Sequence, residues 1–423
     1  MGRARSRAGA YDSSRPKGHH DPVRRSATRD RSPAVPDDAL LPVQPPAQYA
    51  ELRENEPISR AQLKVNGKPA WLVTRHDHIK KVLGDSRVSS NLKLPGYPLQ
   101  VPVPDEILQS VPLTFVSMDP GPHRAAPDAG PGVQPAPDAR AARPDPADRG
   151  QADRRDAGRG RSGGPGLRAR AARPSWSSPN CWASRTRTTS SSRRAAQIMN
   201  HNISEEERGL AHYELDQYVG RLVTAKETEP GDDMLSRLVE LNRAEPTVEY
   251  SDIVSMGKIM LVTGHETTAN MIALGTLALL EHPSSWRRSG GPVAAAARVE
   301  ELLRFFSISD AGTARVALED IEIDGTVIPA GEGILPLNNS ANHDENVFPD
   351  PEARHPPRVR SHLAFGYGVH QCIGQNLARL ELEVVYGTLF RRIPELRLAT
   401  PMNELKFKDD AVVYGIYEMP VTW

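Results

Sequence analysis

The residues best able to do chemistry lie in one short segment, Phe365-Gly366-Tyr367-Gly368-Val369-His370-Gln371-Cys372-Ile373-Gly374. A helical pattern starts directly after it, at Gln375. A cysteine in such a glycine-containing loop has its sulfur near backbone N–H groups and the positive end of a helix, which favours thiolate over thiol. The segment therefore predicts a metal-ligating thiolate at Cys372.

The glycines of this segment indicate what the metal belongs to. Gly366, Gly368 and Gly374 lack a Cβ, so the backbone can turn sharply and lie flat against a broad planar molecule such as a porphyrin. His370 precedes Cys372 by two residues and is placed to meet a polar edge of that molecule, such as a haem carboxylate. The alternative, a buried cysteine acting as a small apolar residue, explains neither the glycines nor the histidine.

A second polar group, Thr263-Gly264-His265-Glu266-Thr267-Thr268, interrupts an apolar helix expected at about 251–280. The Thr267 hydroxyl can bond the carbonyl one turn earlier, and the nearby glycine weakens the helix, so we expect a local opening that admits water or dioxygen. Glu266 beside Thr267 places an acid next to an alcohol, a pair that can relay protons into a closed site. Apolar flanks disfavour the alternative of a solvated polar patch.

Both segments resemble signatures of the cytochrome P450 family, in its bacterial, actinobacterial form. The matching residues are Phe365, Gly366, His370, Cys372 and Gly374 in the haem-binding loop, and Gly264, Glu266 and Thr267 in the oxygen-activation motif, with Thr263 where Ala or Gly is commoner. The resemblance implies that the cysteine thiolate ligates the iron of haem b (iron protoporphyrin IX). It also implies that the acid and the alcohol deliver the protons that oxygen activation needs. The matching parts are about residues 40–118 and 197–423.

Further positions match the family less completely. Glu301 and Arg304 resemble its Glu-x-x-Arg pair, which braces the core behind the haem loop, although Ala353 stands where a third partner is usually an arginine. Arg315 and His123 lie where the family has residues that bind the haem propionates. Without the resemblance, these residues would indicate only a surface ion pair and solvated charges.

Composition excludes several classes of protein. The 423 residues contain 53 Lys and Arg against 53 Asp and Glu, a balance that argues against binding to nucleic acid. With 2 cysteines there is no disulfide framework, which favours the reducing cytoplasm. The basic N-terminus lacks the apolar stretch of a signal peptide, and polar residues interrupt the helix at 251–280, so we expect a cytoplasmic protein without a membrane anchor.

The chain divides into a leader and one domain. Residues 1–36 are basic and rich in Pro and Ser, and we expect them to be disordered. Residues 37–423 form the expected P450 domain, beginning with a helix, a hairpin and another helix. Within it, 119–196 is anomalous, because it is crowded with Arg, Ala and Pro and has no period of helix or strand. Our hypothesis is a disordered insert or a slip of reading frame, which resequencing would test.

These features predict a mainly α fold with small β-sheets, in which a long central helix faces the cysteine loop. The resemblance implies a monomeric monooxygenase that takes electrons from NAD(P)H through ferredoxin and ferredoxin reductase and inserts one atom of O2 into a hydrophobic small molecule. Two alternatives remain open: an impaired or inactive homologue, because of the corrupted middle segment, and a haem sensor or carrier, which would not need Glu266 and Thr267. Polyketides, terpenoids and xenobiotics all remain open as substrates.

Overall fold

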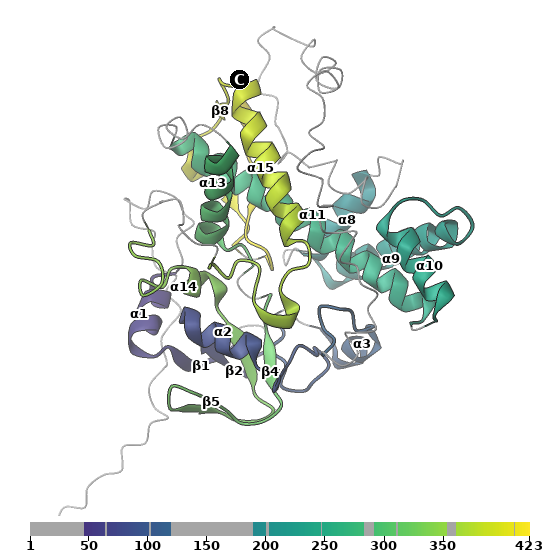
Figure 1. Cartoon of the computed structure of the whole chain (residues 1–423), viewed down its shortest axis with the longest axis horizontal. Coiled ribbons are helices and arrows are strands. Elements are labelled where there is room, and N and C mark those ends of the chain that lie inside the picture. The colour runs from purple at the N-terminus through teal and green to yellow at the C-terminus, as the bar shows by residue number, and fades with distance from the viewer. Residues whose placement is uncertain are drawn as a thin grey trace, which may run out of the picture. The chain divides into compact units, whose positions relative to one another are not determined.

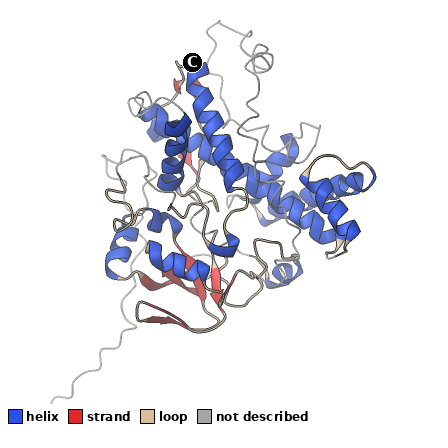
Figure 2. Cartoon of the chain, viewed as in Figure 1, coloured by secondary structure: helices blue, strands red, loops and turns tan. Residues whose placement is uncertain are grey.

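A computed structural model of the chain describes residues 46–63, 66–100, 103–119, 189–199, 203–246, 248–282, 292–309, 312–352, 361–409 and 411–423. They lie within one unit, Val43–Trp423, and helices outweigh short strands among them (Figure 2). This confirms the predicted mainly α fold with small sheets. The expected leader at 1–36, most of the anomalous segment (120–188), His123 and Ala353 lie outside the described residues.

The described helices are α1 (Ala47–Asn55), α2 (His76–Gly84), α3 (Asp105–Ser110), α8 (Thr189–Ile198), α9 (Glu205–Thr228), α10 (Met234–Ala244), α11 (Tyr250–Glu281), α13 (Pro292–Phe306), α14 (Asn338–Asn342) and α15 (Gln375–Arg392), with the short 3-10 helices η3 (Gly368–His370) and η4 (Met402–Glu404). The helices predicted at about 251–280 and from Gln375 are present as α11 and α15. The expectation that order resumes only near Gln197 is wrong, because α8 begins at Thr189. Ala195 of α8 is fully buried in a cluster with residues of α9, α10 and α11, so packing rather than periodicity stabilises this helix.

The strands form one five-stranded sheet and three small hairpins or pairs. They are β1 (Ile58–Gln62), β2 (Pro69–Val73), β3 (Val88–Ser89), β4 (Arg315–Ala317), β5 (Ile321–Ile323), β6 (Thr326–Ile328), β7 (Gly333–Pro336), β8 (Arg397–Leu398), β9 (Lys406–Phe407), β10 (Ile416–Glu418) and β11 (Val421–Thr422). The large sheet has the order β1-β2-β7-β4-β3, and β2 pairs with β7 in parallel. This sheet fixes Arg315, the first residue of β4, next to Ile334 of β7.

Helix α11 is the element against which the other long helices pack. It contacts α8, α9, α10, α13 and α15 (Figure 1). At the crossing with α15, a Cβ on Gly275 would lie 2.0 Å from Tyr386 Oη, so only glycine permits this approach. The Tyr386 hydroxyl donates to the carbonyl of Met271. Close packing here fixes α15 against the second half of α11.

Capping residues set where the long helices begin. Ser204 Oγ accepts the N–H of Glu207 at 3.1 Å, and Glu207 Oε2 accepts the N–H of Ser204 at 3.0 Å, which forms a capping box at the start of α9. Asp233 caps α10 through the N–H of Ser236 at 2.9 Å. No helix in the described part of the chain combines the length and the apolar surface needed to cross a bilayer.

Candidate active site

The backbone of the cysteine loop turns at glycines, as predicted. Gly366 has φ 69° and Gly368 has φ 75°, values that favour glycine. A Cβ on Gly368 would also lie 2.4 Å from the carbonyl oxygen of Leu83 in α2. The Cys372 N–H donates to the Phe365 carbonyl at 2.9 Å, which closes the loop just before α15. Backbone contacts therefore help to set the position of the cysteine.

The thiol of Cys372 is exposed, although protein atoms surround much of it. Burial raises the pKa of the Cys372 thiol, while the N–H groups of Gly374 and Gln375 and the charge of Arg379 lower it by less. As predicted, these N–H groups lower the pKa of the thiol and so favour the thiolate. The prediction that the protein alone favours thiolate over thiol is wrong, since burial outweighs them. A bound metal cation would itself deprotonate the thiol.

One face of α11 is open, although most of this helix is buried. The partly or fully exposed residues of its central part are Ile259, Met260, Thr263, Gly264 and Thr267, which recur at intervals of three and four and so share one side. A Cβ built on Gly264 would meet no atom within 4 Å. We call these five residues the open stripe. Open space therefore lies beside Gly264, one of the predicted oxygen-activation residues.

Threonine hydroxyls bond back along the open stripe. Thr267 Oγ1 donates to the Thr263 carbonyl at 2.6 Å, as predicted, and Thr263 Oγ1 donates to the Ile259 carbonyl at 2.8 Å. The expected local opening of the helix is not seen, because α11 is continuous from Tyr250 to Glu281. The extra hydroxyl bonds are accommodated within the helix.

Glu266 has a partner that the sequence did not indicate. Its carboxylate is 6% exposed and forms an ion pair with Lys408, which follows β9. Asn270 links the two, since its Nδ2 is 3.4 Å from Glu266 Oε1 and its Oδ1 accepts from Lys408 Nζ at 3.0 Å. Gly415 leaves room for this amide, because a Cβ there would lie 2.3 Å from Asn270 Cγ. No local pattern connects a lysine near the C-terminus with the middle of α11.

A second acid contacts the same turn of α11 from α15. The Thr268 hydroxyl donates to the Glu381 carboxylate. Burial raises the pKa of Glu381 to about 7, and the bond from Thr268 lowers it by less. Glu381 therefore changes its charge near neutral pH. It was missed because its helical period marks it only as one of several polar residues of α15.

Asp119 and Ser90 connect the surroundings of Arg315 with His370. Arg315 is 5% exposed, and burial lowers its pKa, whereas the nearby Tyr97 and Asp119 raise it. Asp119 accepts the Ser90 N–H at 3.0 Å, and Ser90 Oγ lies 2.9 Å from His370 Nε2. Ser90, Tyr97 and Asp119 were not predicted, since nothing in their spacing relates them to the cysteine loop.

These surroundings fit a haem. Among the described residues, none places a carboxylate within 4.0 Å of the buried Arg315 guanidinium, whose described hydrogen bond goes to the Ala314 carbonyl at 2.8 Å. A haem propionate is an anion that would balance this charge. Cys372 supplies an accessible sulfur, and the open stripe supplies space. The residues that would hold the group are therefore Cys372, Arg315 and His370, while His123 lies outside the described residues.

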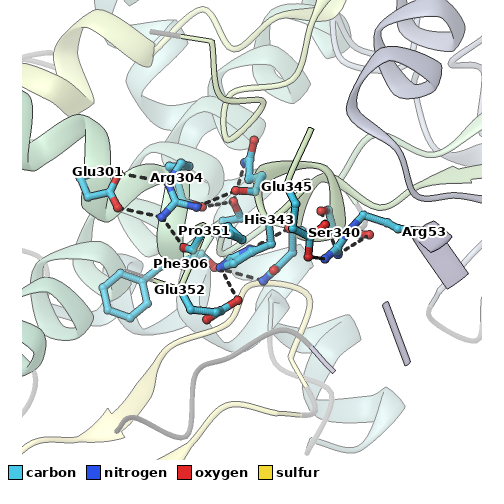
Figure 3. A network of polar contacts seen from close by, with 12 residues as sticks. Arg53, Glu301, Arg304, Phe306, Ser340, His343, Glu345, Pro351 and Glu352 are labelled. Carbon is cyan, nitrogen blue, oxygen red and sulfur yellow. Dashed lines mark hydrogen bonds and ion pairs between the residues drawn. The ribbon is translucent and has the colours of Figure 1, made fainter. Parts of the chain in front are cut away.

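Glu301 and Arg304 form a buried ion pair (Figure 3), which we call the brace. Arg304 binds both carboxylate oxygens of Glu301, at 2.7 and 3.0 Å, and donates to the carbonyls of Asn342 and Pro351, each at 2.7 Å. The two carbonyls accept further N–H groups of Arg304. They do not replace the expected third partner, because an arginine only donates and would pair with Glu301 instead. His343 lies next to this pair. Its burial, together with the nearby positive charges of Arg304 and Arg53, lowers the pKa of His343 to about 4.

Comparison with known proteins agrees with this geometry. The family model described as Cytochrome P450 matches residues 295–405. Pentalenic acid synthase of Streptomyces avermitilis is 38% identical over 414 residues, covering 92% of this chain and 97% of that protein. Vitamin D3 dihydroxylase of Streptomyces griseolus is 36% identical over 409 residues, covering 93% and 97%. The crystal structure of cytochrome P450 MoxA from Nonomuraea recticatena has a TM-score of 0.79 and 39% identity, covering 90% and 96%.

The fold and the cysteine loop thus define a haem-thiolate type of protein. The chain belongs to the cytochrome P450 family and is a monooxygenase of that family. The prediction made from the two sequence signatures is confirmed at this level, and so is the P450 fold.

Proposed function

We propose that the chain holds haem b through Cys372 and inserts one atom of O2 into an unactivated C–H bond or an alkene of a hydrophobic small molecule. The second oxygen atom leaves as water, so each turnover takes two electrons and two protons. NAD(P)H supplies the electrons through ferredoxin and ferredoxin reductase. The haem supplies the redox chemistry when bound. Binding, exclusion of water and movement of protons belong to the protein.

The observation that carries the proposal is the arrangement of α11 at Glu266 and Thr267. Thr267 lies on the open stripe, and the adjacent Glu266 is buried with Lys408. A sensor or carrier of haem has no need for an acid and an alcohol at the boundary between a packed core and free space. A monooxygenase needs both, because protons must reach a site from which bulk water is excluded.

The hydrogen bonds assign separate tasks to the two residues. The Thr267 hydroxyl hydrogen points to the Thr263 carbonyl, at 2.6 Å, which leaves the oxygen lone pairs to accept a hydrogen bond on the open stripe. The Glu266 carboxylate is paired with Lys408 and does not belong to that stripe. Proton transfer then requires Glu266 to leave Lys408, take a proton from water and deliver it toward Thr267. Thr267 orients the acceptor, and Glu266 carries the proton.

The open stripe also indicates the class of substrate. It presents Ile259 and Met260 next to the small Thr263 and Gly264, so an apolar molecule gains contact area while few of its polar groups would find partners. Vitamin D3, named for one relative, is apolar in this sense. We therefore propose an apolar product of secondary metabolism as the substrate, bound along this face of α11.

Absorption spectra of the reduced, CO-bound protein test the proposal. The full chain is expressed, supplied with haem and reduced under CO, and we expect the Soret band to shift as for a thiolate ligand. Cys372→Ala should abolish this shift, whereas Cys181→Ala, the same change at the other cysteine, should retain it. Failure to take up haem would support the alternative of an inactive homologue. Normal thiolate-type absorption in Cys372→Ala would overturn the proposal.

A further inference from the structure

Four residues around the start of the cysteine loop form a group that we call the Glu300 cluster: Glu300 of α13, His362 and Phe365 of the segment before η3, and Arg379 of α15. Of these, only Phe365 belongs to a signature. Arg379 holds the Glu300 carboxylate with two nitrogens, Nε at 2.6 Å and Nη2 at 3.3 Å. His362 Nε2 lies 2.9 Å from Glu300 Oε2. Glu300 and His362 are buried, with exposures of 5% and 8%.

The protonation states of the Glu300 cluster follow from its hydrogen bonds. The Ala364 N–H donates to His362 Nδ1 at 3.3 Å, so Nε2 carries the hydrogen that His362 donates to Glu300. Burial alone would raise the pKa of Glu300, but the bonds from His362 and Arg379 bring it down to about 2. Glu300 is therefore a fixed negative charge at any pH at which the enzyme works, and Arg379 is a fixed positive one.

Arg379 connects the Glu300 cluster with Cys372 in two ways. Its guanidinium carbon lies 4.5 Å from the centre of the Phe365 ring, and the Phe365 carbonyl accepts the Cys372 N–H at 2.9 Å. Arg379 Nη1 also donates to Gln375 Oε1 at 2.9 Å. Gln375 is the first residue of α15, and its backbone N–H bonds the Cys372 thiol. The same cation thus holds both backbone segments that fix the sulfur, and its charge acts on that sulfur directly.

We propose that Arg379 and Glu300 set the reduction potential of the haem iron through the charge they present to the Cys372 sulfur. The inference rests on the proposed function, since it requires haem at Cys372. A positive charge near the sulfur withdraws electron density from the ligand and stabilises reduced iron over oxidised iron. Arg379 therefore raises the potential, and Glu300, which neutralises part of that charge, limits the rise. Such outer groups commonly tune a metal through its ligand.

If the two residues act through their charges, replacing Arg379 and replacing Glu300 should shift the reduction potential in opposite directions. A merely structural role does not predict this. Arg379→Gln removes the cation and should move the potential to more negative values. Glu300→Gln keeps the shape and an acceptor for His362 but leaves Arg379 without its counter-ion, so the potential should become more positive. Arg379→Lys keeps the charge and loses the two-nitrogen contact, and its potential should lie between those of Arg379→Gln and the unchanged protein.

The experiment is a spectroelectrochemical titration of the full-length, haem-loaded protein, with the reduced, CO-bound spectrum recorded for each variant. Arg237→Gln is the matched control, because it makes the same change at an arginine of α10 that forms an exposed ion pair with Asp232. The reduction potential of this variant should equal that of the unchanged protein. If the unchanged protein lacks the thiolate band, the proposed function fails and the inference with it. If the band is present, shifts of equal sign, or no shift, in Arg379→Gln and Glu300→Gln overturn the inference alone. Glu300→Gln decides by itself if Arg379→Gln does not retain haem.

Discussion

Lys408 Nζ contacts Glu266 Oε1 and so joins the end of β9 to the middle of α11, 142 residues earlier in the chain. The carboxylate is buried, and the lysine side chain is 15% exposed. A charge taken out of water this far needs its partner. The acid proposed to carry protons is thus also a structural element, and the two roles can be separated by experiment.

Replacing Lys408 with Met should destabilise the protein, because Glu266 would remain as a buried charge without its cation. We expect the free energy of unfolding to fall by about 2–4 kcal/mol, somewhat less than for a fully buried pair. Urea denaturation measures it. Lys406→Met, at an exposed lysine of β9, should change stability by less than about 0.5 kcal/mol. If Glu266→Gln combined with Lys408→Met does not recover part of the loss, the ion pair is not the cause.

Thr267→Ala should separate electron consumption from product formation. Its hydroxyl is the group that we propose orients the acceptor of the proton, so we expect product formed per NAD(P)H to fall by at least about tenfold, with peroxide released instead. Any compound that the unchanged protein oxidises can serve as the reporter. Thr267→Ser should retain most of the coupling. Thr276→Ala makes the same change at a buried residue of α11, and equal uncoupling in that variant would contradict the assignment.

Arg304→Lys should weaken the brace strongly. A lysine cannot replace the four hydrogen bonds that Arg304 makes to Glu301, Asn342 and Pro351, and buried acceptors would be left without donors. We expect a loss of about 3–4 kcal/mol in the free energy of unfolding, and haem loss at a lower urea concentration. The same change at Arg87, whose pair with Asp85 is 41% exposed on the arginine side, should cost much less, because solvent screens an exposed pair. Similar losses at both sites would mean that the brace adds nothing.

Glu381 should make stability depend on pH between about 4.5 and 7. Its pKa is raised to about 7 in the folded protein, so there the folded state binds more protons than the unfolded state, and the free energy of unfolding falls as pH rises through this window. The loss should be about 1–3 kcal/mol relative to Glu381→Gln, which cannot ionise. Thr268→Val removes the bond that opposes the shift and should enlarge the effect. Parallel pH profiles for Glu381→Gln and the unchanged protein would refute this assignment.

The sequence predicted best the contacts between residues a few positions apart. The bond from Thr267 to Thr263, the pairing of Glu301 with Arg304 and the turns at glycines 366 and 368 all follow from spacing and backbone freedom. The extent of α11 follows from its apolar length. These features are local, and local preferences are what residue types encode directly.

Contacts across the fold could not be predicted in the same way. Lys408 with Glu266, Arg379 with Glu300 at 79 residues and Ser90 with His370 at 280 residues depend on how helices and strands pack. The pKa of Cys372 also depends on contacts across the fold. The N–H donors that lower it could be inferred from the loop, whereas the burial that raises it by more could not. The carbonyls that complete the brace have no sequence signature, because every residue has one.

The order of strands in the large sheet affects how the chain can be made in a cell. The central strand β7 (Gly333–Pro336) pairs with β2 on one side and β4 on the other, and β3 pairs with β4. The free edge of β2 and the strand β3 therefore have no partner until more than half of the chain after them has been synthesised. During translation the open edge of β2 is a template for pairing with other chains. Yield of the folded enzyme should therefore respond to translation speed and chaperone supply, independently of any change at the site where oxygen reacts.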